Sequence, residues 1–190
     1  MKIRPATDAD VQDIIKLTNP ERNRVGFFSP GALYDHIGRR GTAVALVGGK
    51  LVGVVSGYRS MRYARWCRPI SLLVVDPHYR RRHIGTALVA RVAREATDDG
   101  QLALQAWTRQ DVPGWQLWPA LHFDPICVKH VPTADRKATI LFRKRLTAVA
   151  HPDHFTAPPV AGWKAQRLTA VLTIADSAHT AVPDTHPPHP

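Results

Sequence analysis

The stretch between residues 70 and 89 constrains the fold most strongly, because it predicts a strand, a sharp turn and a helix in direct succession. The apolar run Ile70-Ser71-Leu72-Leu73-Val74-Val75 stops at Asp76-Pro77. Three consecutive arginines, Arg80 to Arg82, come next, and an amphipathic segment begins at Gly85. A buried strand therefore feeds a basic turn that opens a helix.

This turn predicts an anion-binding site. The first amides of a helix have no intrahelical partner and carry a partial positive charge. The arginines of the turn, Arg80 to Arg82, add formal positive charge beside them. Such an arrangement suits a pyrophosphate. The alternative is a plain strand-to-helix turn with solvated arginines.

The same stretch resembles the acyl-CoA-binding segment of the GNAT superfamily of N-acetyltransferases, whose pattern is Q/R-x-x-G-x-G/A after a strand ending in V-x-P. Val75 and Pro77 match the strand end. Arg80 matches the first position of the pattern and Gly85 matches the last. His83 stands where the family usually has its first glycine, which lets the backbone approach phosphate closely. We expect His83 to keep its N–H in place through a negative φ, as in the first turn of a helix.

The resemblance implies acetyl-CoA as a co-substrate and no metal. Family members pair the pantetheine arm with the end of the fourth strand, which here falls on Leu73, Val74 and Val75. The residues that the resemblance assigns to the pyrophosphate are Arg80, Arg81, Arg82, His83, Gly85 and Thr86. For the side chain of Arg80, orientation of the loop is the alternative role.

The family's usual general acid is a tyrosine in a late helix, within a pattern like L-Y-x-x-x-G-F. The corresponding stretch is Leu117-Trp118-Pro119-Ala120-Leu121-His122-Phe123, so Trp118 replaces the tyrosine and His122 replaces the glycine. An indole N–H donates a hydrogen bond but gives up no proton at neutral pH. Trp118 is therefore a candidate for orienting the sulfur, and simple packing beside Trp115 is the alternative.

No general base is clearly marked, but three further polar side chains are catalytic candidates and one more residue is a candidate for the acceptor site. Tyr58 and Ser71 are polar residues on predicted central strands. Asp111 follows the strand Leu102–Trp107, where substrate groups gather at a switch point of the sheet. His36, on a predicted second helix, is either an acceptor-site residue or an ordinary surface histidine.

The order of elements over residues 1–147 also resembles the GNAT fold. The predicted class is α/β (α+β), a mixed and mostly antiparallel central sheet with a parallel pair at the acyl-CoA cleft, flanked by helices. The parallel pair joins strands 68–75 and 102–107, because a helix links them. The other predicted strands are 3–6, 43–47, 51–58, 123–131 and 139–146, and the helices are 7–17, 30–37, 86–96 and 111–120. Residues 148–178 are predicted to be a linker with a C-terminal helix over 163–175, and the Pro/His-rich residues 179–190 to be disordered.

Composition limits the class of protein. The chain has 190 residues, a net charge of +11 and two cysteines without metal-ligand spacing. No secretory signal or membrane span is apparent, so a cytoplasmic protein is expected. The charge favours anionic partners, or the excess of arginine over lysine reflects a GC-rich genome. Arg59, Arg62, Arg65 and Arg68, interleaved with Tyr63 and Trp66, keep tRNA or DNA among the candidate substrates, although a solvated hairpin is the alternative.

The leading hypothesis is an acetyl-CoA-dependent N-acetyltransferase that moves the acetyl group by direct attack of a primary amine. The acceptor is a small molecule, a peptide, or an amine on tRNA or DNA. The alternative is a catalytically degenerate GNAT-fold protein that binds acyl-CoA or nucleic acid without turnover, and His83, Trp118 and His122 favour it. The resemblance also makes a homodimer an expectation.

Overall fold

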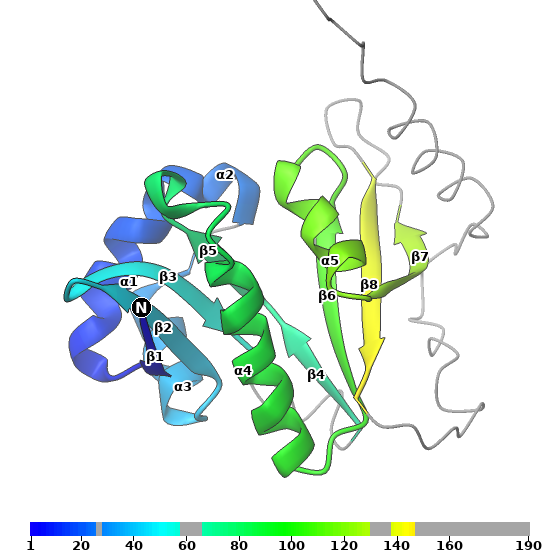
Figure 1. The fold of residues 1–190 in the computed structure, drawn as a ribbon, viewed down its shortest axis with the longest axis horizontal. Helices are drawn as coiled ribbons and strands as arrows, with labels where there is room; N and C mark the ends of the chain where they lie inside the picture. Colours follow the sequence, from blue (N-terminus) through cyan, green and yellow to red (C-terminus); the bar gives the residue numbers. More distant parts are fainter. Residues whose placement is uncertain (26–27, 58–65, 130–137, 147–190) are drawn as a thin grey trace, which may run out of the picture.

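Hydrogen bonding divides the strands of the computed structural model into two sheets (Figure 1). The structure describes residues 1–25, 28–57, 66–129 and 138–146. Within these ranges, each sheet has four strands, in the orders β1-β2-β3-β5 and β4-β6-β8-β7. Predictions for Tyr58, for the turn near 132–137 and for residues 148–190 fall outside the described residues.

The first sheet is antiparallel throughout. Its strands are β1 (Lys2–Pro5), β2 (Thr42–Val47), β3 (Lys50–Ser56) and β5 (Leu72–Val75). Gly48 and Gly49 join β2 to β3 with φ values of 56° and 81°, which glycine adopts without steric cost. The predicted hairpin is thus confirmed.

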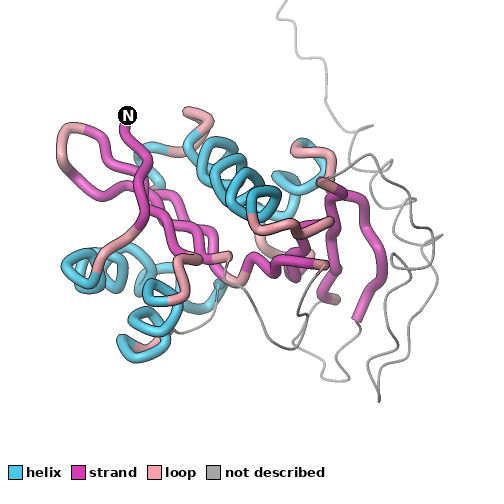
Figure 2. Tube along the Cα trace, turned by 90° about the horizontal axis from the view of Figure 1, so that it is seen from below, coloured by secondary structure: helices cyan, strands magenta, loops and turns pink. Residues whose placement is uncertain are grey.

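Helices cover both faces of the first sheet (Figure 2). On one face, α1 (Val11–Thr18) and α3 (Pro30–Gly38) bury Ile14 and Leu33 against Val54 and its neighbours. On the other face, α4 (Ile84–Asp98) buries Leu88 and Val92. These helices appear where the apolar spacing of the sequence predicts them, and Ser29 caps α3 by accepting a hydrogen bond from the Ala32 amide at 3.2 Å.

The second sheet carries the parallel pair. Its strands are β4 (Cys67–Ile70), β6 (Ala103–Arg109), β8 (Thr139–Arg145) and β7 (Asp124–Lys129). β4 runs parallel to β6, and β8 is antiparallel to both β6 and β7. The short elements are η1 (Asp8–Asp10), η2 (Asn19–Glu21), α2 (Arg22–Val25), η3 (Pro77–Tyr79), η4 (Pro113–Gln116) and α5 (Leu117–Ala120).

The predicted class, mixed and mostly antiparallel with one parallel pair, is confirmed, but the single strand predicted over 68–75 is divided. β4 ends at Ile70, opposite Ala106 of β6, whereas β5 begins at Leu72, opposite Ser56 of β3. Ser71 lies between them, and its amide donates to the Ser56 carbonyl at 2.9 Å. Because β6 holds β4 while β3 holds β5, the two sheets separate at Ser71.

One arginine of the interleaved run has a structural role. Arg68 is only 2% exposed. Its Nε donates to Gln101 at 2.6 Å, and its guanidinium pairs with Asp99 at the end of α4. Arg68 therefore neither faces solvent nor is available to nucleic acid, because its charge is buried and paired with these partners. The other three arginines of that run lie outside the described residues.

Candidate functional site

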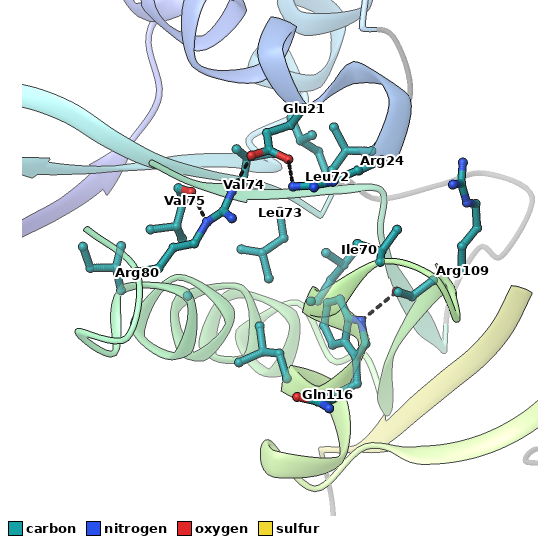
Figure 3. A pocket seen from close by; sticks show the side chains of 18 of the residues that line it. Glu21, Arg24, Ile70, Leu72, Leu73, Val74, Val75, Arg80, Arg109 and Gln116 are labelled. Carbon is teal, nitrogen blue, oxygen red and sulfur yellow. Dashed lines mark hydrogen bonds and ion pairs between the residues drawn. The ribbon is translucent and has the colours of Figure 1, made fainter. Parts of the chain in front are cut away.

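A cleft of about 1210 Å³ opens where the two sheets separate. One wall consists of β5 and the start of α4, and the other of β6, η4 and α5. Residues of η2 and α2 also line it, and Figure 3 shows Glu21 and Arg24 on that side. Of the predicted cofactor residues, the ones that line the cleft are Leu73, Val74, Val75, Arg80, Arg81, His83, Gly85 and Thr86.

Arg82 is the predicted cofactor residue that does not line the cleft. It is exposed, and its guanidinium lies 5.5 Å from the centroid of the Tyr79 ring. Tyr79 does line the cleft, so Arg82 contacts a residue of the cleft wall without lining the cleft itself.

The free edge of β5 presents backbone groups to the cleft. The Asp76 amide donates to Val52 of β3 at 2.9 Å. Because hydrogen-bonded and non-hydrogen-bonded pairs alternate in an antiparallel ladder, Val74 also bonds toward β3, whereas Leu73 and Val75 direct their N–H and C=O groups away from it. The carbonyl of Val75 accordingly accepts a hydrogen bond from Arg80 Nε at 3.0 Å. The side chain of Leu73 also points into the cleft (Figure 3).

The first turn of α4 supplies amides at the next part of the same wall. The helical ladder begins with the Ala87 amide donating to His83 at 3.0 Å. The amides of Ile84, Gly85 and Thr86 therefore have no intrahelical acceptor, and the His83 side chain makes no capping bond. Free amides at a helix N-terminus are the donors that an anion site of the predicted kind would need.

The expected negative φ of His83 is wrong. His83 has a φ of 59°, and Arg81 two residues earlier has a φ of 61°. Left-handed residues that alternate with residues of negative φ turn successive amides toward a common point, as in anion-binding nests. The chain thus keeps a backbone shape that glycine usually provides, although a side chain there costs about 1 kcal/mol.

Arg80 ties the basic turn to its surroundings. Besides its bond to Val75, its guanidinium pairs with Glu21 of η2, which also pairs with Arg24 (Figure 3). Burial raises the pKa of Glu21, but the hydrogen bonds from Arg80 and Arg24 outweigh it and hold that pKa below its usual value. This geometry matches the alternative role for the Arg80 side chain, orientation of the loop. Glu21 matches no motif, so it was not predicted from the sequence.

On the opposite wall, Trp118 is 5% exposed and its indole N–H donates to Thr108 Oγ1 at 2.7 Å. The Trp118 ring packs edge-on against Phe123, with centroids 5.1 Å apart. The sequence suggests that this N–H orients the sulfur of the cofactor, but in the structure it is bonded to Thr108. Thr108 also lines the cleft. Sequence reasoning missed Thr108, because a threonine at the end of a strand matches no motif.

The remaining candidates differ in position. Ser71 is exposed and lines the cleft, and its hydroxyl donates to Ser56 O at 3.3 Å. Asp111 is not a lining residue; it accepts two hydrogen bonds from Arg109, which does line the cleft, and this contact raises the pKa of Arg109.

His36 does not line the cleft. Its Nδ1 lies 2.9 Å from Ser56 Oγ, and burial lowers its pKa. The cavity therefore gathers Ser71 and Trp118 but neither Asp111 nor His36.

The charge of the cleft favours an anionic ligand. Its basic lining residues are Arg22, Arg24, Arg80, Arg81, Arg109 and His83, whereas Glu21 is the acidic residue among the described lining. In the described ranges, no three His, Cys, Asp or Glu side chains gather as a metal site would require. Over those same ranges, every helix is too short or too polar to cross a bilayer.

A family model described as Acetyltransferase (GNAT) family matches residues 10–123, more than half of the chain and all of the strand–turn–helix segment. The chain belongs to the GNAT acetyltransferase family. This membership makes it an acetyltransferase and agrees with the cleft between the separated sheets. Comparison with curated protein sequences gives no match.

Solved structures share the fold of this GNAT acetyltransferase. Ard1 from Thermoplasma volcanium superposes with a TM-score of 0.68 at 17% identity, covering 77% of this chain and 97% of the other. The putative acetyltransferase YncA from Salmonella typhimurium, solved with acetyl-CoA, gives 0.67 at 20% identity, with coverages of 80% and 98%. The ribosomal-protein-S18-alanine N-acetyltransferase from Escherichia coli gives 0.63 at 18%, with coverages of 80% and 97%.

Proposed function

We propose that this protein is an acetyl-CoA-dependent N-acetyltransferase that transfers the acetyl group directly to a primary amine. The pyrophosphate of CoA lies on the amides of Ile84, Gly85 and Thr86. The pantetheine arm runs along β5 and pairs with the backbone of Leu73, as an added strand would. The acetyl thioester then lies between Leu73 and the β6–α5 wall.

One observation carries this proposal: the free edge of β5 and the first turn of α4 open onto the same cleft. A nucleotide-linked thioester needs both, because its diphosphate requires clustered donors and its amide-containing arm requires a strand edge. The surplus of arginines over Glu21 in the lining adds attraction for the anionic cofactor.

Catalysis at such a site rests mainly on placement. Holding the thioester rigidly turns the attack of a bound amine into an effectively unimolecular step. The amine nitrogen adds to the carbonyl carbon, and the C–S bond breaks with its electron pair on sulfur. Ser71, exposed at the separation point, lies in the region where the acceptor would enter. The acceptor is a small molecule, a peptide, or a nucleic-acid amine.

The test combines binding and turnover. Calorimetric titration with acetyl-CoA is expected to show saturable binding, and a mixed pool of amines, peptides and tRNA is expected to release free thiol. Gly85→Glu should weaken CoA binding about a hundredfold or more, because it adds charge and bulk at the phosphate amides. The matched control is Gly31→Glu on α3, where an added side chain meets nothing within 4 Å.

Two outcomes would contradict the proposal. Binding of CoA to the folded Gly85→Glu variant with unchanged affinity would remove the phosphate site from α4. Binding by the native protein without turnover on any amine would favour a degenerate GNAT-fold binder instead.

A further inference from the structure

We propose that the hydroxyl of Thr108, oriented by the indole of Trp118, donates a hydrogen bond to the sulfur of CoA as the thiolate leaves. This inference rests on the proposed function and concerns the group that supports the leaving sulfur. It assigns Thr108 as a catalytic residue and Trp118 as the residue that positions it.

The direction of the Thr108–Trp118 hydrogen bond carries the argument. An indole N–H is a donor and never an acceptor, so Thr108 Oγ1 must be the acceptor of the 2.7 Å bond. The proton of the Thr108 hydroxyl then points elsewhere. Among the described residues, no contact accepts that proton, and Thr108 lines the cleft.

The position of Thr108 matches the place where a thioester would end. Thr108 follows Ala106, the last β6 residue paired with β4, so it lies just beyond the point where the sheets separate. It faces the same side of β6 as Ala106, since strand side chains alternate. β5 lines the facing wall of the same cavity.

Trp118 is held firmly enough to fix the direction of that hydroxyl. Its ring is almost fully buried and lies edge-on against Phe123. Trp118 belongs to α5, ten residues after Thr108 in the chain. An indole that cannot turn holds the oxygen in one position. A donor set in place before the reaction stabilises developing charge more than one that must reorient.

The step balances without proton transfer from the protein. The amine forms a C–N bond to the carbonyl carbon, and the C–S bond breaks with its electron pair remaining on sulfur. The amine releases its proton to solvent, and the sulfur leaves as a thiolate that later takes a proton from solvent. Thr108 donates a hydrogen bond and keeps its own proton, so no residue with a lowered pKa is needed.

A titration of the bound CoA thiol tests this directly. Thiolate absorbs in the ultraviolet, so the pKa of CoA bound to the native protein can be read from absorbance against pH. Thr108→Val should raise that pKa by about one unit, since the hydrogen bond favours the charged form. It should also lower kcat about tenfold to a hundredfold while leaving KM for acetyl-CoA within about twofold.

Three variants separate a specific role from a structural one. Thr108→Ser keeps the hydroxyl and should restore most of the native thiol pKa. Trp118→Phe should give part of the shift alone and no further shift in the Thr108→Val background, because it acts through Thr108. Thr97→Val, on the exposed end of α4 where the hydroxyl bonds Ala93 O, should leave the titration unchanged.

The outcomes are distinguishable. If CoA binds with equal thiol pKa and kcat in the native protein and in folded Thr108→Val, the role of Thr108 is refuted while the proposed function stands. Should the native protein bind no CoA, the proposed function fails and this inference fails with it.

Discussion

The β5–α4 wall of the cleft offers backbone groups to a ligand, whereas the β6–α5 wall offers side chains. On the first wall, the Leu73 edge and the Gly85 turn depend on local chain geometry. On the second, Thr108 and Trp118 meet only because α5 folds back on β6. Binding through backbone groups should depend less on side-chain identity, since His83 has a left-handed φ at a position where the family pattern has glycine. Chemistry through side chains, as at Thr108 and Trp118, should depend on those particular residues.

Proline substitutions on β5 test this difference with the largest expected effect on CoA binding. Leu73→Pro removes an N–H that points to the cleft, and edge strands tolerate proline on their free side. We expect a folded protein with about tenfold weaker CoA binding by calorimetry. Val74→Pro, at the neighbouring position, removes an N–H that bonds β3. This variant should disrupt the first sheet, which circular dichroism would detect. Native CoA affinity in Leu73→Pro would show that pantetheine does not use this edge.

The charge of the cleft gives a smaller effect. Glu21→Gln removes the acidic residue of the described lining and releases Arg80, so CoA affinity should rise about threefold at low salt. The gain should fade as salt screens the charge. Asp35→Asn, an equal charge change on α3 outside the cleft, is the control. A loss of affinity in Glu21→Gln would instead make the Glu21–Arg80 pair a support of the binding loop.

Glycine substitutions at the two histidines with left-handed φ are expected to have the smallest effect on CoA affinity. They test one equivalent residue on each wall. His83 precedes α4 and His122 follows α5, with φ values of 59° and 60°. Glycine at either position should raise the free energy of unfolding by about 0.5–1 kcal/mol in urea titrations. Only His83→Gly, which changes a lining residue, should also alter CoA affinity. Equal effects of both variants on binding would contradict the division between the walls.

The sequence predicted what is local and missed what is tertiary. The turn after Pro77, the hairpin at Gly48-Gly49 and the parallel pair follow from neighbouring residues, and the structure has them. The break at Ser71 was not predicted, because a continuous apolar run does not show that its two halves pair with different sheets. Glu21 and Thr108 were missed for a similar reason: their roles come from partners distant in the chain. The left-handed His83 was missed because its residue type gives no sign of it.

The central claim is that CoA lies along β5 with its pyrophosphate on the first amides of α4. Backbone amide NMR of the isotope-labelled protein, titrated with CoA, tests it most directly. We predict large shifts for Leu73, Gly85 and Thr86, and small ones for β1, on the far edge of the first sheet. Saturable binding that leaves the Gly85 and Thr86 amides unmoved, with shifts elsewhere, would contradict the account.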